Sequence, residues 1–436
     1  MLRPIAAVLL GGVLLAPAAV VAPVLAAGSE LRVLLLEGSA VPLAALDRPL
    51  LLRGPTPTAG AALVSLSAGE TATLHLEAGR LRLERDAGSQ LLPPLAALWI
   101  EPAAPALPAA AAAGGDFQLQ QRRYRGRLQI RLSGASLQAI NHVPLEQYLP
   151  SVVGSEMPAS WPQAALRAQA VAARTYALRQ RQPRLAFDLS ATVSSQVYKG
   201  VEAETDSTRE AVAATRGQVL TYAGQLANTV FHSSAGGLTE NSGDLWSQQL
   251  PYLVSVPDFD QDSPVHAWQQ RLDPAQLQQA FPETGGIDRV DVLATTASGR
   301  LRQVRLHGPH GSLVLSGAQL RSRLGLRSTQ VRFQLVPAEV ASGAPDAGPL
   351  PAGPAAPGRL GAALAELPPP PPLPVLQGPP PSPVSRPALL AIGRGFGHGV
   401  GMSQWGAHAM ALQGRSHEQI LRHYYRGTRL SLDAAR

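Results

Sequence analysis

Glu156 is the residue of this sequence best suited to acid–base chemistry. It stands in the segment Glu-Met-Pro-Ala-Ser-Trp-Pro, in which two prolines and a tryptophan make a stiff turn. Partial burial in such a turn would raise the pKa of the carboxyl group toward neutral, as a general acid requires. The alternative is a solvated loop glutamate or a helix-capping partner, and this residue alone does not separate the two.

A second group of polar residues follows a strand expected at 226–231. His232 and Ser233 come first, and two glycines then lead to Glu240. Neighbouring strand residues point to opposite faces, so His232 and Ser233 are poorly placed to act as a nucleophile pair. We therefore expect a binding loop in which His232 contacts substrate or positions the acid, and in which Glu240 is the best second carboxylate. A structural histidine is the alternative.

Glycine occupies every second position from 393 to 401, around His398. As a strand, this stretch would have one bare face, open to a sugar ring or another backbone, and one face carrying Arg394, Phe396 and His398. The pattern differs from G-x-G-x-x-G, so it does not indicate a nucleotide site. His398 has no partners at a spacing that suits a metal, and we expect no metal site and no cofactor.

Two further segments carry polar side chains whose pattern is less specific for one function. Tyr198 and Gln196 can contact a sugar, because a tyrosine ring stacks on a pyranose, but a buried tyrosine with a satisfied hydroxyl is equally compatible. Asp258, Asp260 and Asp262 are spaced like the start of a calcium loop. They lack the glycine and the terminal glutamate of an EF-hand, so we expect a solvated loop.

The element that must position Glu156 is the helix that follows it. Ser160 can cap this helix, Pro162 suits its first turn, and seven alanines between 164 and 177 favour it. Most of its circumference is small or apolar, which predicts a buried central helix. One polar stripe, expected to face water or a cleft, comprises Gln163, Arg167, Arg174 and Arg181.

Composition restricts the partners and the chemistry. The chain has 436 residues, a net charge of +7 and a pI of about 10.2, and it contains no cysteine. The positive charge favours an anionic partner such as a cell-wall polymer or a membrane surface. The sequence has no nucleic-acid motif, so we expect no nucleic-acid partner. Without cysteine, disulfides, thiol nucleophiles and cysteine-ligated zinc are excluded.

Residues 1–27 read as a signal peptide or a membrane anchor. A short positive start precedes an apolar run that ends in small residues, as at a signal-peptidase site. The run is also nearly long enough to span a bilayer. We therefore expect an extracytoplasmic protein, secreted, periplasmic or in the cell wall, that contacts the membrane only through this segment if it is not cleaved.

The expected fold class is α+β, a mixed-sheet scaffold around the buried alanine-rich helix, preceded by a small β-rich domain. Short apolar runs between turn residues predict the strands of this first domain, residues 28–100. The Pro/Ala-rich residues 101–115 predict a linker to a second domain at 116–436. Within that domain, residues 337–388 are dominated by proline, alanine and glycine and predict a disordered insertion.

The motifs resemble those of the stage II sporulation protein D (SpoIID/LytB) family. The likeness covers the Glu156 segment with its helix, the Ser-x-Gly-Gly-x-Thr-Glu loop at 234–240, and Gly-x-Gly-x-Gly-His-Gly-x-Gly-Met-Ser-Gln at 393–404. It implies a lytic transglycosylase, a lyase acting on peptidoglycan glycan strands stripped of their peptides, with Glu156 as the catalytic acid/base. The resemblance also implies substrate-binding roles for Arg174, Tyr198, His232, Ser233, Glu240, His398 and Gln404.

A lytic transglycosylase needs one carboxylic acid, whereas ordinary glycoside hydrolysis needs two. The acid would protonate the oxygen of the MurNAc–GlcNAc linkage, and the C6 hydroxyl of the same sugar would attack C1 to leave a 1,6-anhydro-MurNAc end. Two alternatives remain. One is a glycoside hydrolase that uses Glu156 with Glu240. The other is a non-catalytic protein that binds cell-wall glycan or enhances a cell-wall amidase.

Overall fold

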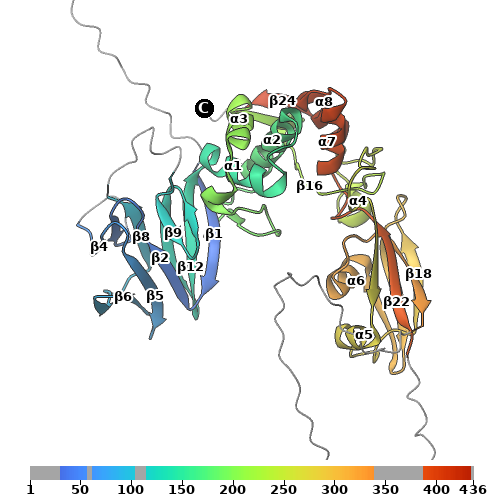
Figure 1. Ribbon diagram of the computed structural model, residues 1–436, viewed down its shortest axis with the longest axis horizontal. Coiled ribbons are helices and arrows are strands. Elements are labelled where there is room, and N and C mark those ends of the chain that lie inside the picture. The colour runs from blue at the N-terminus through green and yellow to red at the C-terminus, as the bar shows by residue number, and fades with distance from the viewer. Residues whose placement is uncertain (1–29, 56–60, 104–113, 338–385, 434–436) are drawn as a thin grey trace, which may run out of the picture. The chain divides into compact units, whose positions relative to one another are not determined.

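The computed structural model describes residues 30–55, 61–103, 114–337 and 386–433. The predicted signal or anchor segment at 1–27 lies outside the described residues, as do residues 338–385 of the predicted insertion. The chain forms two compact units; in Figure 1 the first is mostly blue to green, with the red β24 of the C-terminal segment, and the second is mostly yellow to red. Unit 1 comprises Met1–Trp161, Gln169–Ala227 and Leu430–Arg436, and unit 2 comprises Pro162–Ala168 and Asn228–Arg429.

The N-terminal part of unit 1 forms two mainly antiparallel sheets. Alternate residues of their strands are buried, Leu31 and Val33 of β1 for example, which is the pattern of a sheet with one face on a core. The sheet orders are β13-β1-β12-β11-β8-β3-β4 and β10-β9-β2-β5-β6-β7. The strands are β1 (Glu30–Gly38), β2 (Ala40–Ala44), β3 (Leu50–Arg53), β4 (Val64–Leu66), β5 (Thr71–Glu77), β6 (Arg80–Arg85), β7 (Gly88–Leu91), β8 (Ala97–Pro102), β9 (Phe117–Leu119), β10 (Arg122–Tyr124), β11 (Arg127–Ser133), β12 (Ser136–Pro144) and β13 (Leu189–Ser190).

The strands before and after the predicted linker share both sheets. β1 pairs with β12 from Glu30↔Pro144 to Gly38↔Leu137, β8 pairs with β11, and β2 pairs with β9. Residues 28–100 therefore do not form a domain apart from residues 117–144. The expected boundary at 101–115 followed from its Pro/Ala composition, which carries no information about strands that pair across it.

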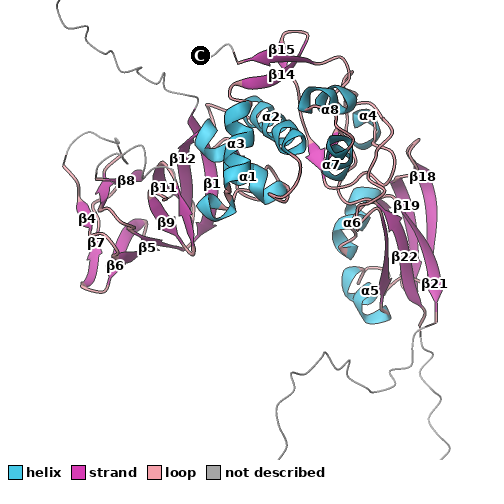
Figure 2. Cartoon of the chain, turned by 45° about the horizontal axis from the view of Figure 1, so that its top comes forward, coloured by secondary structure: helices cyan, strands magenta, loops and turns pink. Residues whose placement is uncertain are grey.

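Three helices follow β12 in unit 1: α1 (Leu145–Glu156), α2 (Gln163–Arg179) and α3 (Asp206–Ala214). They gather beside β1 and β12 in both views (Figures 1 and 2). Six of the seven alanines of α2 are fully buried and Ala164 is partly buried, and the helix crosses from unit 2 into unit 1 after Ala168. The remaining elements are η1 (Gly200–Ala203) and a small sheet of β14 (Gln218–Tyr222), β15 (Gln225–Leu226) and β24 (Arg429–Leu432).

Unit 2 holds three small sheets and five helices within its described residues. Its core packs Phe281, which follows α5, and Leu320 of α6 against Trp268, Val304 and Leu389 of the strands. The elements are β16 (Phe231–His232), α4 (Ser242–Leu245), β17 (Ala267–Leu272), α5 (Pro274–Ala280), β18 (Arg289–Thr295), β19 (Leu301–Gly308), β20 (Gly311–Ser316), α6 (Gly317–Leu324), β21 (Val331–Val336), β22 (Ala388–Arg394), β23 (Met402–Ser403), α7 (Gln404–Leu412) and α8 (His417–Tyr424).

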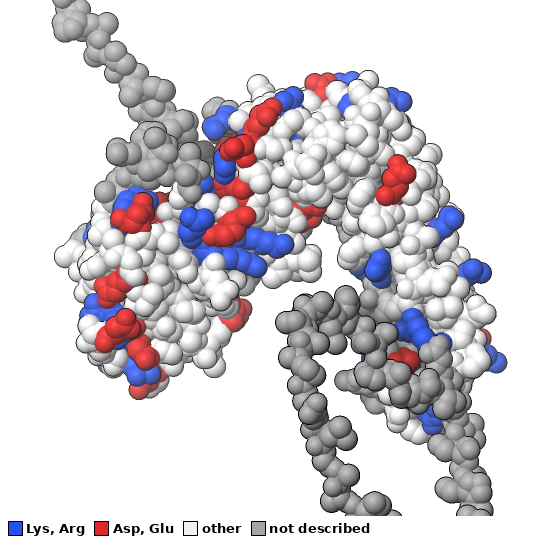
Figure 3. All heavy atoms as spheres, viewed as in Figure 1, with Lys and Arg blue, Asp and Glu red and all other residues white. Residues whose placement is uncertain are grey.

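The predicted fold class, α+β, is confirmed by these sheets and helices. Within the described ranges, no helix is long and apolar enough to cross a membrane. Acidic and basic side chains lie next to one another over unit 1 in Figure 3, as the ion pairs Arg32–Asp188 (2.7 Å) and Arg123–Glu202 (2.8 Å) require. The positive charges of unit 1 are therefore largely matched by local carboxylates.

Candidate functional site

Glu156 is the last residue of α1 and is partly buried. Its Oε1 accepts a hydrogen bond from the backbone N–H of Val197, at 3.2 Å. Two residues earlier, Gly154 lets α1 approach η1 closely, because a Cβ at 154 would lie 1.9 Å from the Ala203 carbonyl oxygen. The sequence placed Glu156 in the turn, whereas the structure places it at the helix end that precedes the turn. The stiff turn starts only at Met157.

A buried tyrosine pair lies behind Glu156. Tyr198 is buried, its hydroxyl donates to Asn141 at 3.1 Å, and its ring lies 4.7 Å from that of Tyr148. The Tyr148 hydroxyl in turn donates to Gln196 at 3.2 Å. Burial raises the pKa of both tyrosines. Of the two possibilities that the sequence left open for Tyr198, the buried tyrosine with a satisfied hydroxyl is the one observed, so it supports the Glu156 segment from behind.

Arg174 is fully buried and clamps three elements of unit 1. Its guanidinium donates twice to Glu146 of α1, at 2.9 Å each, and also to Thr215 at 3.4 Å and to the Val212 carbonyl at 3.3 Å. The expectation that its stripe faces water or a cleft is wrong at this position. The helical spacing placed Arg174 on one side of α2 correctly, but α1 and α3 cover that side. Substrate could reach this guanidinium only if these hydrogen bonds broke.

The alternating glycines do not form the expected strand. β22 ends at Arg394, and Gly395, Gly397, Gly399 and Gly401 have φ angles of 70°, 114°, 85° and 75°. These angles lie in the left-handed region, which glycine adopts without a steric penalty. The stretch is therefore a glycine loop, and its period of two reflects repeated backbone reversals instead of strand pleating.

Two histidines meet where this glycine loop packs on the loop after β16. β16 and β23 pair in parallel, with His232 opposite Ser403. The rings of His232 and His398 lie 5.3 Å apart, and the partly exposed Trp246 lies 5.6 Å from His398. A Cβ at 397 would lie 2.7 Å from the Cβ of His232. The structure thus joins two of the predicted site residues through a contact that needs glycine.

Both histidines are held in the neutral form. Burial, then the charges of His398 and Arg300, lower the pKa of His232 well below its usual value. Burial, then Arg300, lowers the pKa of His398 to about 4. Val400 donates its N–H to Nδ1 of His398 (3.0 Å), and its carbonyl oxygen lies 3.1 Å from Nδ1 of His232. His398 therefore carries its proton on Nε2, and His232 on Nδ1.

Nε2 of His232 is left as an acceptor. It is buried and has no hydrogen-bond partner among the residues that the structure describes. Ser233 is partly buried, and its carbonyl oxygen accepts the N–H of Trp405. Gln404 is buried at the first position of α7, which Ser403 caps. His232, Ser233, His398 and Gln404 are therefore brought together in unit 2, whereas Glu156, Arg174 and Tyr198 lie in unit 1.

Glu240, the expected second carboxylate, is fully buried. Its Oε2 accepts hydrogen bonds from Thr296 at 2.6 Å and from Ser298, and its Oε1 accepts the N–H of Asn241 at 3.0 Å. Arg300 lies 4.0 Å away, which neutralises part of the charge. The side chain belongs to the packing beneath the glycine loop and is not open to solvent. The sequence predicted a polar binding loop here, and a polar pattern does not report what covers the loop.

Sequence reasoning missed Arg300, which is completely buried under the glycine loop. A Cβ at 399 would lie 2.5 Å from its guanidinium carbon, and its Nη2 donates to the Ala235 carbonyl at 2.7 Å. Its Nε and Nη1 have no hydrogen-bond partner within the described ranges. Burial lowers its pKa to about 10. Nothing in the local sequence Ser-Gly-Arg distinguishes this residue from an ordinary turn arginine.

Asp258 and Asp260 were expected in a solvated loop, and this expectation is wrong. Both are buried. The hydroxyl of Tyr424 donates to Asp258 at 2.6 Å, while Ser234, the N–H of Gly236 (2.7 Å) and His266 (3.0 Å) contact Asp260. These carboxylates bind the histidine loop to α8. Asp258 and Asp260 share the parity of the buried Val256, whereas Pro257 and Phe259 between them are more exposed, and this alternation was the available signal.

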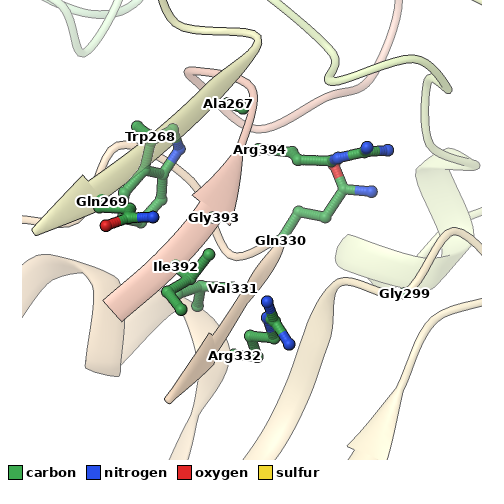
Figure 4. Close-up of a pocket in the computed structure, with 10 residues that line it drawn as sticks. All are labelled: Ala267, Trp268, Gln269, Gly299, Gln330, Val331, Arg332, Ile392, Gly393 and Arg394. Atoms are coloured by element: carbon green, nitrogen blue, oxygen red, sulfur yellow. The ribbon is translucent and has the colours of Figure 1, made fainter. Parts of the chain in front are cut away.

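A groove of about 690 Å³ lies at the end of the β17-β22-β21 sheet (Figure 4). Trp268 packs on Gly393, where a Cβ would lie 2.1 Å from the indole. Arg394 and Gln330 both flank Gly236 of the histidine loop, at 2.8 and 2.7 Å from the position of its Cβ. The groove thus connects the start of the glycine motif with the histidine loop and offers amide and guanidinium donors to a polar ligand. No group of three or more histidine, aspartate and glutamate side chains suited to a metal occurs in the described part of the chain.

Fold and site together define an α+β protein with a glutamate at a helix end in one unit and a glycine-framed histidine pair in the other. The family model for stage II sporulation protein (SpoIID) matches residues 133–222, which include Glu156, Arg174 and Tyr198. Stage II sporulation protein D of Bacillus subtilis (strain 168) is 30% identical over 313 residues, which are 67% of this chain and 76% of that protein. The chain belongs to the stage II sporulation protein D family.

Two further relatives show similar agreement. Stage II sporulation protein D of Bacillus amyloliquefaciens is 30% identical over 313 residues, which are 67% of this chain and 76% of that protein. A protein named amidase enhancer from Bacillus subtilis (strain 168) is 29% identical over 308 residues, which are 65% of this chain but 40% of that protein.

Proposed function

We propose that this chain is a lytic transglycosylase that cleaves the MurNAc–GlcNAc linkage of peptidoglycan glycan strands, with Glu156 as its acid/base. The observation that supports it most is the setting of Glu156. The side chain is partly buried at the last residue of α1, where the negative end of the helix dipole disfavours a carboxylate charge. The Val197 N–H orients one carboxyl oxygen. A proton donor that is oriented and still partly accessible is what the first chemical step needs.

The proposed reaction uses the one carboxyl group twice. Protonated Glu156 gives its proton to the glycosidic oxygen as the C1–O bond breaks. The C6 hydroxyl of the muramyl sugar then attacks C1, and the Glu156 carboxylate accepts the hydroxyl proton. The products are a 1,6-anhydro end and a free hydroxyl on the leaving sugar. No water enters, and the enzyme returns to its protonated state.

The burial of Glu240 favours this reaction over hydrolysis. A hydrolase needs a second carboxylate that reaches the sugar or a water molecule next to it. Glu240 is fully buried and both of its oxygens accept hydrogen bonds from the protein. It therefore cannot serve as nucleophile or base without a rearrangement of the loop.

We assign glycan binding in unit 2 to the histidine cluster. Trp246 is 39% exposed beside His398, and an exposed indole can stack on a sugar ring. Nε2 of His232 has no hydrogen-bond partner among the described residues, and it can accept a sugar hydroxyl only after a movement of the loop that buries it. Strands stripped of stem peptides are the proposed substrate, and an extracytoplasmic location, reached through residues 1–27, is proposed with them.

A second candidate function is the enhancement of a cell-wall amidase. The specific support is the relative whose printed name is amidase enhancer. In that case the chain would bind glycan, and the side chain of Glu156 would not be required.

The test replaces Glu156 with Gln and measures cleavage of purified glycan strands by mass spectrometry. We expect cleavage to fall by about 10²–10⁴-fold, the usual contribution of a general acid, while strand binding persists. Glu210→Gln on α3, an exposed carboxylate, is the control and should cleave normally. In water enriched in heavy oxygen, the 1,6-anhydro product stays unlabelled. Labelled reducing ends would indicate a hydrolase, and undiminished activity of Glu156→Gln would overturn the proposal.

A further inference from the structure

A small pocket in unit 2 lies apart from the histidine cluster, between the end of α7, α8 and the loop at Phe259. Its volume is about 280 Å³, enough for one sugar ring or one small acid. Three arginines line it: Arg415, Arg422 and Arg426. None of them belongs to the motifs that the proposed reaction uses.

The positive charge of this pocket is not matched by local acids. Arg422 faces Glu418 at 3.5 Å, an exposed pair that contributes little. No carboxylate of the described residues lies within 4.0 Å of the Arg415 or Arg426 guanidinium, unlike the paired arginines of unit 1. The negative ends of α7 and α8 favour a nearby cation at each helix. They do not explain why three guanidiniums surround one pocket, where the like charges repel one another.

The pKa of His423 shows that the charges of Arg426 and Arg415 both act on this side of the pocket. Burial lowers the pKa of His423, and the charges of Arg426 and Arg415 lower it further. His423 donates its Nε2 hydrogen to the Pro257 carbonyl at 2.7 Å, which fixes the ring as a neutral wall of the pocket. A neutral histidine adds no charge, so Arg415 and Arg426 keep their positive charges without an acidic partner within 4.0 Å among the described residues, and Arg422 has only the exposed pair with Glu418.

The wall behind the arginines is apolar and aromatic. Phe259 lies 5.4 Å from the His423 ring, and Met410 is buried next to it. Asp258, which precedes Phe259 in the sequence, is buried in the interior, where it accepts a hydrogen bond from the Tyr424 hydroxyl. The pocket therefore combines an apolar surface with guanidinium donors, the combination that recognises the carboxylate of an otherwise neutral, ring-shaped ligand.

We propose that this pocket binds a carboxylate carried by the glycan strand, with the arginines as its donors. The inference rests on the proposed function, because the strand supplies the ligand. The carboxylate has two possible sources: the lactyl group of an unsubstituted muramic acid, or the peptide of a substituted one. Arg415 and Arg426 are the principal contacts, because neither has another acidic partner within 4.0 Å in the described part of the chain.

The experiment compares three probes on the full chain by ligand-observed NMR and titration. N-acetylmuramic acid carries the lactyl carboxylate, N-acetylglucosamine has the same ring without it, and N-acetylmuramyl-L-alanyl-D-isoglutamine carries its carboxylate on the peptide. We expect N-acetylglucosamine to bind at least about tenfold more weakly than the better acidic probe, because it lacks the charge-assisted contact between carboxylate and guanidinium. Preference for the first or the third probe identifies the source.

Variants connect the binding to the pocket. Arg415→Gln combined with Arg426→Gln should weaken the acidic probe about tenfold or more, and Arg426→Lys should retain part of the affinity. Arg305→Gln, an exposed arginine of β19 outside the pocket, is the matched control. Equal binding of all three probes, or an unchanged double variant with a normal unfolding curve, would overturn the inference.

The outcome is separable from that of the proposed reaction. Glu156→Gln should bind the acidic probe like the unmodified chain. Probe binding by a protein that does not cleave strands would refute the transglycosylase and retain the pocket. Strand cleavage by a protein whose arginine variants bind the acidic probe normally would refute the pocket and retain the transglycosylase.

Discussion

Asp258 and Asp260 stand two positions apart and ionise in opposite ways. Burial, then the charge of Asp260, raises the pKa of Asp258 to about 6. Burial acts in the same direction on Asp260, but hydrogen bonds from Ser234, Gly236 and His266 outweigh it and lower its pKa. One proton is thus retained in a pair that holds the histidine loop.

This pair predicts how stability depends on pH. A carboxyl group whose pKa is raised on folding binds more protons in the folded state than in the unfolded state. The stability that protonated Asp258 contributes is therefore complete below its unfolded-state pKa of 3.8, and it is lost as the pH rises through the folded-state pKa of about 6. We expect the free energy of unfolding to fall by up to about 3 kcal/mol between pH 4 and 6.5 from this group. Urea unfolding across that range measures it.

Asp258→Asn provides the control for this prediction. The amide cannot ionise, so the slope between pH 4 and 6.5 should flatten, although the variant loses the hydrogen bond from the Ala235 N–H (3.2 Å) and is less stable at low pH. Asp260 has a lowered pKa, so its own contribution is lost only as pH falls below the unfolded value of 3.8. A slope of equal size in Asp258→Asn would contradict the assignment.

The helices of unit 1 are connected by a buried ion pair. Arg174 of α2 reaches Glu146 of α1 with two hydrogen bonds and the end of α3 with others. A charge removed from water needs all of its partners, because an uncompensated buried charge costs several kcal/mol. The pair thereby couples the position of α1, and of Glu156 at its end, to that of α2.

Arg174→Ala should therefore lower the stability of the protein, and any loss of activity should follow from that destabilisation. We expect a loss of about 3–5 kcal/mol in the free energy of unfolding, because Glu146 loses its partner. Arg174→Lys should lose part of this, since lysine does not make the bidentate contact. Arg181→Ala, at an exposed position of the same predicted stripe, should be nearly neutral. A variant of Arg174 with normal stability and a raised KM would instead support a substrate-binding role.

The path of the chain through unit 1 links distant segments. β1 runs between β13 and β12, so residues 30–38 form part of the sheet that leads directly into α1. Leu31 and Val33 are fully buried there. The β-rich N-terminal region is thus part of the scaffold under the helix that carries Glu156.

A chain that begins at residue 116 should consequently fail to fold as a cooperative unit. It lacks β1, β3 and β8, which leaves β12 and β11 with unpaired edges and exposes the apolar side chains that face them. A chain that begins at Ser29 retains every described strand and should unfold like the full protein. Circular dichroism and thermal unfolding compare the two. A stable, cooperative chain from residue 116 would show that residues 28–100 are a separate domain after all.

Local pattern was enough to predict most elements. Apolar runs between turn residues predicted a strand-rich region before residue 100, where β1 to β7 are found, and the alanine content with Pro162 predicted α2. These features depend on neighbours within a few positions, which is the range over which side-chain period and capping act. The motif residues Glu156, His232 and His398 could be singled out for the same reason.

What each site residue touches was decided by packing between segments far apart in the chain. Arg174 and Glu240 look like polar residues available to a ligand, yet α1, α3 and the 296–300 turn bury them. The glycines from 395 to 401 look like a strand, but each has a positive φ angle. His232, Arg300 and the Val230 carbonyl also occupy the space of a Cβ at 397, 399 and 401. Burial and backbone handedness depend on which surfaces meet. No local spacing encodes that, and only the tertiary structure determines it.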